Sequence, residues 1–382
     1  MRPMHLSHVI ASLDARHGGP SKATRLLAEA QADLGARVDL LAGAEESGEE
    51  VRGNLTVTLL KRGWWERFGI IPGLGASLRA GTPDLVHAHG LWLHTLGVAH
   101  TVARARRVPL VVSPRGMMSP WSWQRRRWRK RLAEQWLHPG ALAAVAGWHA
   151  TSDEEADDIR ALGYRQPICV APHGVEVPDA AALTAAREHW IRVCPECGRR
   201  PTALFYSRFH AKKRVLELID LWLAKAPTEW LLLLVGVPEQ YSVEALRAYV
   251  YRAGGSRRIE VFDGLNQPAP YAAASICLLP SHSENFGMVV AEALAAGVPA
   301  LVTDRTPWKL LDAARAGWCV PWSDYGTALQ SALAELPDAL RARGATARAW
   351  AHATFAWSNS ARTLLDFYSQ LGPSPAEAKD PA

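Results

Sequence analysis

The chain has 382 residues, of which 48% are hydrophobic and 21% charged, with a formal net charge of +6. These values are typical of a globular protein long enough for two domains, and they exclude a membrane-spanning helix, because no apolar run is long enough to cross a bilayer. The first residues are too weakly apolar for a signal peptide, and five scattered cysteines are typical of a reducing compartment. We therefore expect a cytoplasmic protein.

Apolar runs of strand length alternate with helical stretches along the whole chain, which predicts an α/β fold with parallel sheets. The first series of predicted strands is His5–Ala11, Arg37–Ala42, Leu55–Lys61, Leu85–Ala88, Pro109–Ser113 and Ala144–Ala150. The second series is Thr202–Tyr206, Trp230–Gly236, Ile259–Phe262, Ile276–Pro280, Ala300–Thr303 and Cys319–Pro321. Two doubly wound, Rossmann-like domains would face each other across a cleft at the carboxyl ends of their strands.

The composition between the two series sets the predicted domain boundaries. We expect a first domain over residues 1–178, a linker over 179–201 and a second domain over 202–344. Helical periodicity over 345–371 predicts a C-terminal helix that packs back toward the first domain. The Pro-rich, charged stretch 372–382 is predicted to be disordered.

Two features of the first domain are candidates for a binding site. Gly18 and Gly19 precede Pro20, which suits the first turn of a helix. Alternation along the predicted strand places His87 and His89 on one side of it, with His89 nearer the carboxyl end, where ligands of such sheets bind. We expect His89 to be functional and His87 structural. No metal is expected here, since no carboxylate or cysteine lies at ligand spacing.

A basic segment, Arg125 to Arg131, carries Trp128 and is followed by Trp136. With Leu132 between them, the two tryptophans recur every four residues and share one helix face. This helix either meets an anionic membrane surface or packs on its own domain through the tryptophans. Nucleic-acid binding is not expected, because no recognised module accompanies the charge.

The loop after the first strand of the second domain carries cations. Arg208 and Lys213 are five residues apart, which allows both to reach one phosphate group, whereas Lys212 and Arg214 are expected to be solvated. Earlier in the chain, Cys194 and Cys197 resemble half of a zinc site, but the second cysteine pair that zinc would need is missing.

The segment from Glu284 to Pro299 is the most informative in the chain. Glu284 and Glu292 lie eight residues apart on either side of Gly287, which is predicted to open a helix after an apolar strand. A helix amino end with a glycine brings backbone N–H groups close to an anion. Phe286 is expected to pack rather than stack on a ligand. With the upstream cations, this chemistry fits a diphosphate that carries hydroxylated groups at both ends, as in a nucleotide-sugar.

With these residues in view, the chain from about His5 to Leu371 resembles glycosyltransferase family 4, whose members are retaining enzymes of GT-B fold. Arg208, Lys213 and the Glu-x7-Glu pair match the second half of the family pattern, and the glycine loop and histidine motif match the first half. Segments Ser113–Met117 and Thr306–Trp308 resemble polysaccharide-assembly members. Three places depart from the family pattern: Arg214, where a glycine commonly follows the lysine, His173, where an asparagine is common, and Cys194–Arg200, which resembles an unusual insertion.

The resemblance implies transfer of a sugar from a nucleoside diphosphate sugar to a saccharide or lipid-linked saccharide, with no metal or other cofactor. Arg208 and Lys213 would neutralise the leaving diphosphate. The remaining implied contacts are Glu292 with ribose, Glu284 with the sugar, Phe286, Gly287 and Met288 with sugar and phosphate, Gly18 and Gly19 with phosphate, and His89 with sugar or acceptor.

Two alternatives remain open at this point. One is an epimerase or hydrolase of GT-B fold that acts on the same nucleotide-sugar, and the other is a scaffold that has lost activity and binds a partner enzyme. Either assignment of the basic helix also remains, so the protein is expected in the cytoplasm, with peripheral contact to the inner membrane face if that helix binds lipid.

Overall fold

The computed structural model describes residues 2–14, 19–63, 65–124 and 127–372 of the chain. Gly18, Arg125, Arg126 and the predicted disordered tail from residue 373 onward lie outside these ranges. The chain divides into two compact units. The first contains the residues up to Gly174 together with those from Trp357 onward, and the second contains Val175–Ala356.

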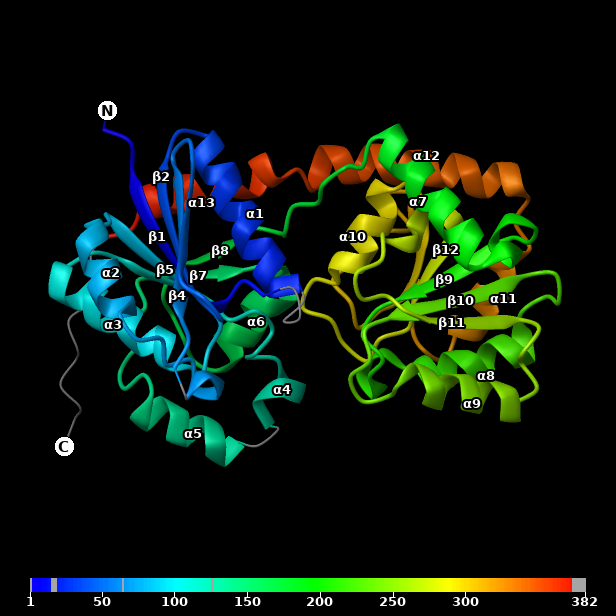
Figure 1. Ribbon diagram of the computed structural model, residues 1–382, viewed down its shortest axis with the longest axis horizontal. Coiled ribbons are helices and arrows are strands. Elements are labelled where there is room, and N and C mark those ends of the chain that lie inside the picture. The colour runs from blue at the N-terminus through cyan, green and yellow to red at the C-terminus, as the bar shows by residue number, and fades with distance from the viewer. Residues whose placement is uncertain (1, 15–18, 64, 125–126, 373–382) are drawn as a thin grey trace. The chain divides into compact units, whose positions relative to one another are not determined.

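The first unit is a sheet with helices on both faces (Figure 1). Its strands follow the order β3-β4-β2-β1-β5-β6-β7-β8, and all neighbours are parallel except β3 and β4. The strands are β1 (His5–Ser12), β2 (Arg37–Ala44), β3 (Gly48–Arg52), β4 (Leu55–Lys61), β5 (Leu85–His89), β6 (Leu110–Ser113), β7 (Gly147–Ala150) and β8 (Ile168–Val170). The helices are α1 (Gly19–Asp33), α2 (Leu74–Gly81), α3 (His94–Arg106), α4 (Pro120–Gln124), α5 (Arg127–Trp136), α6 (Asp153–Ala161) and α13 (Trp357–Ser369), with the short turn η2 (Glu66–Phe68).

Alternation along the strands of the first unit divides its core between the two faces of the sheet. Leu85 of β5 packs on the face that α1 and α13 cover, while Val86 and Ala88 pack on the opposite face. His87 and His89 therefore lie on the α1/α13 face, as the alternation predicts.

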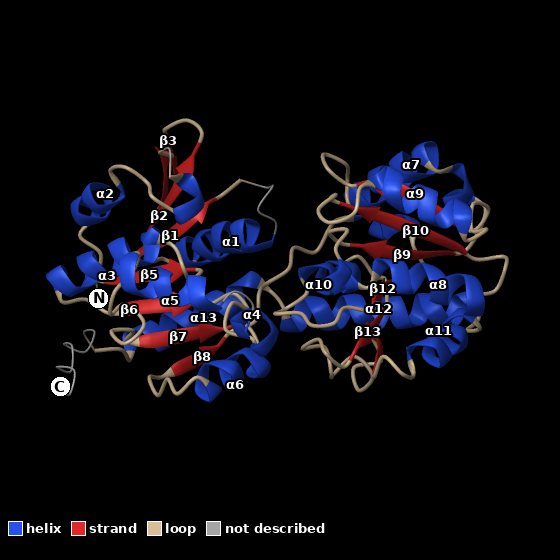
Figure 2. Cartoon of the chain, turned by 90° about the horizontal axis from the view of Figure 1, so that it is seen from below, coloured by secondary structure: helices blue, strands red, loops and turns tan. Residues whose placement is uncertain are grey.

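The second unit repeats this architecture with a fully parallel sheet, in the order β11-β10-β9-β12-β13-β14 (Figure 2). The strands are β9 (Thr202–Tyr206), β10 (Leu231–Gly236), β11 (Ile259–Asp263), β12 (Ile276–Leu279), β13 (Ala300–Thr303) and β14 (Gly317–Val320). The helices are α7 (Ala180–Val193), α8 (Val215–Lys225), α9 (Val243–Arg252), α10 (Met288–Ala295), α11 (Tyr325–Leu333) and α12 (Pro337–Thr354), with the turns η3 (Pro195–Gly198), η4 (Ala211–Lys213) and η5 (Pro270–Ala273).

The predicted linker at residues 179–201 is corrected by the structure, which places these residues in the second unit as α7 and η3. Asp179 caps α7 by accepting from the Ala182 N–H at 2.7 Å. Trp190 anchors the helix, since its ring is fully buried and its Nε1 donates to the Pro268 carbonyl at 2.8 Å. Trp190 is the one large apolar anchor in an Ala-rich stretch, so the hydrophobic periodicity of the sequence was too weak to predict a packed helix. Cys194 and Cys197 follow as buried free thiols.

The predicted helix at residues 345–371 is two helices. Its first part continues α12 of the second unit, and the chain breaks at Phe355 before α13 enters the first unit. Only α13 therefore packs in the first unit, where it contacts α1. The buried Phe355 ring contacts the partly buried Trp350 ring within the hydrophobic core of the second unit, which fixes the end of α12 there.

Each sheet has one point at which the strand order reverses. In the first unit it lies at β1 and β5, and in the second at β9 and β12. Ligands of doubly wound sheets bind beyond the carboxyl ends of the strands at such a point. His89 ends β5, Arg208 and Lys213 follow β9, and Glu284 and Glu292 lie in the loop and helix that follow β12, so the topology brings these residues to the expected place in each unit.

Candidate functional site

The loop after β9 carries the two predicted phosphate ligands, Arg208 and Lys213, which differ in their burial and in their partners. His210 caps η4 by accepting from the Lys212 N–H at 2.9 Å, and this tight turn directs Lys213 inward, where its side chain is 9% exposed. Arg208 lies before the turn, is 57% exposed, and pairs with Glu239 at 2.9 Å. Lys213 is therefore a buried cation, whereas Arg208 is a surface cation with a carboxylate partner that sequence reasoning missed.

Arg214 occupies a left-handed backbone conformation, with φ of 52°. This explains why a glycine is common at the position, because glycine adopts that conformation without strain. Arg214 is partly buried rather than fully solvated. Its Nη2 contacts the His282 ring at 2.9 Å, and its guanidinium lies 4.5 Å from the centre of the Trp322 ring.

Glu284 and Lys213 form a buried ion pair between the β9 loop and the β12 loop. The Lys213 ammonium donates to Glu284 Oε1, which also accepts from Ser281 Oγ at 2.6 Å. Burial acts to raise the pKa of Glu284, but the Lys213 and Lys212 ammonium groups outweigh it, so the pKa lies below its ordinary value. The carboxylate is thus ionised at neutral pH, and one strand-end cation neutralises it.

Gly287 opens α10 in the left-handed conformation, with φ of 78°. A side chain at this position would be strained, and its Cβ would lie 3.3 Å from Trp308 Nε1. That indole donates to the Phe286 carbonyl at 2.6 Å, and the Phe286 ring is buried against Trp308. Phe286 therefore packs, as expected, and its backbone with Gly287 and Met288 forms the amino end of α10, which is suited to an anion.

Glu292 lies one turn beyond Met288 on α10 and is half-buried. Tyr271 of η5 donates its hydroxyl to Glu292 Oε2 at 2.8 Å. The pKa of Tyr271 lies well above its ordinary value, mainly because the side chain is buried and also because the Glu292 carboxylate is close. The hydroxyl therefore keeps its proton and remains a donor. Tyr271 gave no signal in the sequence, because it reaches Glu292 from a distant turn.

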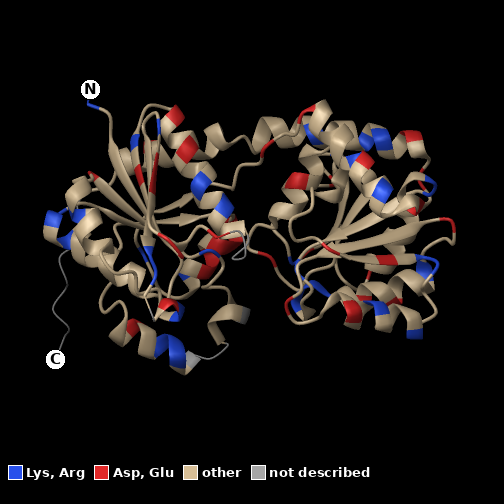
Figure 3. Cartoon of the chain, viewed as in Figure 1, with Lys and Arg blue, Asp and Glu red and all other residues tan. Residues whose placement is uncertain are grey.

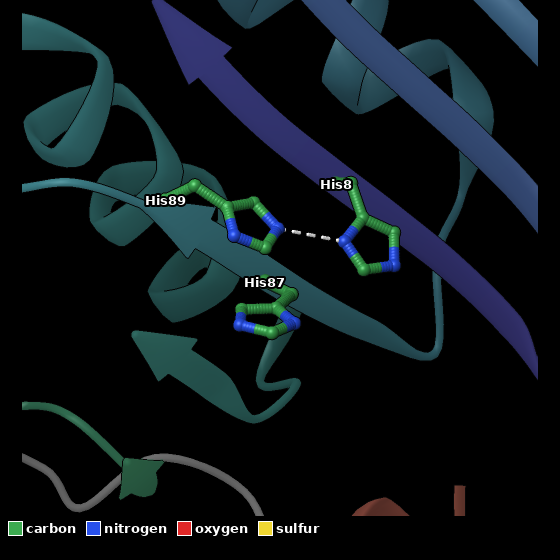
Figure 4. A group of neighbouring side chains, drawn as sticks. All are labelled: His8, His87 and His89. Carbon is green, nitrogen blue, oxygen red and sulfur yellow. Dashed lines mark hydrogen bonds between the residues drawn. The ribbon is translucent and has the colours of Figure 1, made fainter. Parts of the chain in front are cut away.

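In the first unit, three buried histidines lie together at the reversal point (Figure 4). His8 Nε2 lies 2.7 Å from Gln31 Oε1, which can only accept, so His8 carries its proton there. His8 Nδ1 must then accept, and His89 Nε2–H donates to it at 2.8 Å. His89 Nδ1 in turn accepts from Arg115 Nη2 at 2.8 Å. Both ring nitrogens of His89 are engaged, so contact with a ligand would require one of these bonds to break.

A second chain of hydrogen bonds fixes His87. His149 donates from Nε2 to the Ala171 carbonyl at 2.9 Å, so its Nδ1 accepts from Ser113 Oγ at 2.8 Å. Ser113 Oγ therefore accepts from His87 Nε2 at 2.7 Å, and His87 Nδ1 accepts from the Tyr368 hydroxyl at 2.7 Å. His87 is structural in this arrangement, because it ties α13 to the sheet.

Arg115 holds the positive charge of this region. Burial lowers the pKa of Arg115 to about 10, so the guanidinium stays charged at neutral pH. Burial also lowers the pKa of His8 to about 4, and burial with the neighbouring His87 and Arg115 holds the pKa of His89 well below its ordinary value. The second Arg115 nitrogen, Nη1, donates to the His173 ring at 2.7 Å, which gives a role to the residue that departs from the family's asparagine.

The ligand atoms of His8, His87 and His89 lie within 4.8 Å of one another, a spacing that a metal ion could bridge. All six ring nitrogens already have hydrogen-bond partners, and the Arg115 guanidinium touches one of the rings. A metal cation would have to break these hydrogen bonds, and the positive Arg115 guanidinium would repel it. The cluster is therefore better described as a hydrogen-bond network than as a metal site.

The remaining predictions for the first unit concern Gly19 and the basic helix. Gly19 is the exposed first residue of α1, while Gly18 lies outside the described residues. In α5 the side chains of Trp128 and Trp136 are 62% and 78% exposed, so the helix does not pack on its own domain through them. Figure 3 marks the basic residues along this helix. No described helix is long and apolar enough to cross a membrane.

Comparisons with known proteins agree with this arrangement. Residues 18–174 match the family model of the glycosyl transferase 4-like domain, and residues 200–338 match that of glycosyl transferases group 1. A D-inositol 3-phosphate glycosyltransferase of Xylanimonas cellulosilytica is 29% identical over 75% of this chain and 72% of its own. A GDP-mannose:cellobiosyl-diphosphopolyprenol alpha-mannosyltransferase of Xanthomonas campestris is 24% identical over 70% of this chain and 68% of its own.

Among solved structures, sucrose-phosphate synthase from Thermosynechococcus elongatus aligns with a TM-score of 0.74 at 21% identity, over 96% of this chain and 98% of its own. HepE from Anabaena in complex with UDP-glucose aligns with a TM-score of 0.73 at 17% identity, over 96% of this chain and 100% of its own. At these identities the likeness concerns the fold.

Proposed function

Because this chain is a glycosyltransferase of GT-B fold and family 4 type, we propose that it transfers a hexose from a nucleoside diphosphate sugar to a hydroxyl of a saccharide or lipid-linked saccharide. Transfer would proceed with retention at the anomeric carbon, in the synthesis of a surface polysaccharide such as an exopolysaccharide, O-antigen or capsule. The observation that carries this proposal is the buried pair of Lys213 and Glu284 beside the amino end of α10.

The donor diphosphate would meet three kinds of positive charge. Arg208 and Lys213 would neutralise the charge that develops on the leaving group, and the N–H groups at Phe286, Gly287 and Met288 would border the phosphate and the sugar. Since side chains and backbone supply this stabilisation, the mechanism requires no divalent ion or other cofactor.

The two acids and the first unit would bind the remaining groups. Glu292, oriented by Tyr271, would accept from ribose hydroxyls, and Glu284 would accept from hydroxyls of the transferred sugar. Gly18 and Gly19 would contact the phosphate. His89 would contact the sugar or the acceptor once a ligand group replaces one of its present hydrogen-bond partners.

Two comparisons support these substrate classes. The HepE structure contains UDP-glucose, which is a nucleotide-sugar. The name of the Xanthomonas relative gives a nucleotide-sugar donor and a saccharide on a diphosphopolyprenol, which is a lipid-linked acceptor.

The test is a thermal-shift screen of the full chain with UDP-, GDP-, ADP- and dTDP-sugars. We expect one donor class to raise the unfolding temperature of the wild type and to have a weaker effect on Arg208→Ala. The bound donor is then incubated with saccharide acceptors, and NMR of the product reports its anomeric configuration. Release of free sugar or of an epimer, without transfer to any acceptor, would instead identify a hydrolase or an epimerase.

We further propose that α5 brings the enzyme to an anionic membrane surface, in keeping with a lipid-linked acceptor. Each basic residue near such a surface contributes about 1 kcal/mol, and salt screens the attraction. Arg129→Gln with Arg131→Gln should therefore weaken sedimentation with phosphatidylglycerol vesicles about 30-fold at low salt. The matched control is Arg252→Gln with Arg257→Gln, two exposed arginines of the second unit. Equal losses in both double variants would show that α5 is not the contact.

A further inference from the structure

A large groove lies in the first unit between α5, the turn η2 and the end of β5. Its volume is about 970 Å³, at the upper end of the roughly 300–1,000 Å³ of small-molecule sites. Trp128, Leu132 and Trp136 line it from successive turns of α5, and Phe68 of η2 and Trp92 line it from other segments. The groove is separate from the histidine cluster, although Trp92 follows His89 by only three residues.

The apolar wall of this groove is exposed. Trp128, Leu132 and Trp136 are 62%, 45% and 78% exposed, while Ala133 on the same helix is buried. A stripe of two indole rings and a leucine is costly to leave in water, and contiguous patches of this kind mark binding surfaces. Ala133 lines the groove as well, so α5 buries a small residue there and leaves its large ones exposed.

Trp92, which lines the same groove, has a strained backbone. Its backbone is left-handed, with φ of 65°, which is a genuine outlier for a bulky side chain. Its ring packs at 5.3 Å from Trp123, and its buried Nε1 has no hydrogen-bond partner among the described residues. Strain of this kind is retained where a side chain must be held in one place, and binding sites are the common case.

The charges that line the groove have one sign. Arg67, Arg129 and Lys130 line it, and none of its lining residues is an aspartate or glutamate. The Lys130 ammonium lies 5.6 Å from the centre of the Trp92 ring and 5.8 Å from that of the Trp123 ring, so a cation adjoins the aromatic side chains. An occupant that satisfies both features has a long apolar body and an anionic head.

We propose that this groove binds the proximal isoprene units of a polyprenyl diphosphate, with its diphosphate against Arg67, Arg129 and Lys130. The proposal rests on the proposed transfer to a lipid-linked acceptor and names the part of the protein that recognises the lipid. Because Trp92 follows His89, the last residue of β5, by only three residues, a chain held in the groove keeps the attached saccharide near the end of the sheet. Each buried methylene strengthens such binding roughly fourfold.

The test measures binding of farnesyl diphosphate, below its micellar concentration, to the full chain by isothermal titration calorimetry. Farnesyl diphosphate should bind at least about tenfold more tightly than inorganic diphosphate, because only the former carries the chain. Trp128→Gln with Leu132→Gln should lose at least about tenfold in this affinity. Both residues are exposed, so the variant should fold. The control is Tyr251→Gln with Leu310→Gln, an exposed aromatic and leucine of the second unit, which should bind as the wild type does.

Three results would overturn the proposal. The first is equal affinity of wild type and groove variant for farnesyl diphosphate. The second is equal affinity of the wild type for farnesyl diphosphate and inorganic diphosphate, which would place the ligand in a phosphate site. The third is binding to anionic vesicles without binding of monomeric farnesyl diphosphate, which would make the tryptophans a bilayer contact only. Nucleotide-sugar binding, measured on the same samples, is independent: its loss in all proteins would refute the proposed function and leave a groove-dependent lipid site standing.

Discussion

Replacement of Lys213 by methionine should destabilise the second unit through the carboxylate that it leaves behind. Both side chains of the Lys213–Glu284 pair are 9% exposed, so water can replace little of the lost ammonium. Removal of one partner from a buried pair costs about 3–5 kcal/mol. Ser281 Oγ still donates to Glu284, and Lys212 still lies near it, so we expect about 3 kcal/mol, the lower end of that range.

The double-mutant cycle separates charge from packing. Lys213→Met with Glu284→Gln leaves no buried charge, so it should lie within about 1 kcal/mol of the wild type, and the coupling between the two positions should be large. Hydrogen exchange of the α10 and β12 amides measures the local free energy of opening in each variant. If the losses of opening free energy in the two single variants simply add in the double variant, Lys213 and Glu284 are not energetically coupled and the argument fails.

The pH dependence gives the same cycle a second readout. In the wild type the pKa of Glu284 is depressed, so its contribution to stability is present above the unfolded-state pKa and is lost as pH falls through the folded-state pKa. Without Lys213, burial should raise this pKa above its ordinary value, which reverses the sign: stability then falls as pH rises from the unfolded-state pKa to the folded-state one. The deficit of Lys213→Met should therefore shrink in acid, and a deficit that is constant with pH would refute the argument.

Three further substitutions test the site and its support. Arg208→Ala should cost about 2–4 kcal/mol of transition-state stabilisation in kcat/KM, and Lys212→Ala much less; an inactive Lys212→Ala beside a normal Arg208→Ala would invert the assigned roles. Glu292→Gln should weaken binding of the free nucleoside diphosphate, measured by calorimetry, whereas unchanged affinity would argue against a ribose contact. Tyr368→Phe should destabilise the first unit by about 1–3 kcal/mol, since it leaves a buried histidine nitrogen without its donor. The exposed Tyr251→Phe is its control, and equal unfolding temperatures for the two would contradict the hydrogen-bond chain.

Local sequence patterns predicted most of the fold. Buried strands such as β10 and β12 are continuous apolar runs, and their order along the chain defines both units. The edge strand β3 was missed because its residues are exposed and polar, and β8 because it has only three residues. The segment containing Trp190 was misassigned for a similar reason, since one anchor residue gives no periodicity.

Site residues on a single loop or helix were found from the sequence, while their partners from elsewhere in the fold were not. Glu284 and Glu292 stand out by their spacing around Gly287, and Lys213 by its place after a strand. The contacts of Tyr271, Arg115 and Tyr368 depend on which strands and turns become neighbours in space. A buried hydrogen bond between residues 281 positions apart, as for His87 and Tyr368, leaves no trace in local sequence.

The structure also changes how the predicted roles relate to one another. The family resemblance implied that Lys213 serves the phosphate and Glu284 the sugar, as separate ligands. In the structure the two side chains satisfy each other, so a diphosphate that binds Lys213 competes with Glu284 for the same ammonium group. Withdrawal of the lysine would leave the carboxylate in need of new donors, and sugar hydroxyls are suitable ones. Donor phosphate and donor sugar are therefore expected to bind cooperatively through this pair.

For that reason a single substitution at Lys213 or at Glu284 changes both the recognition of the donor and the stability of the second unit. Only the double variant, which leaves no buried charge unpaired, can separate the two effects.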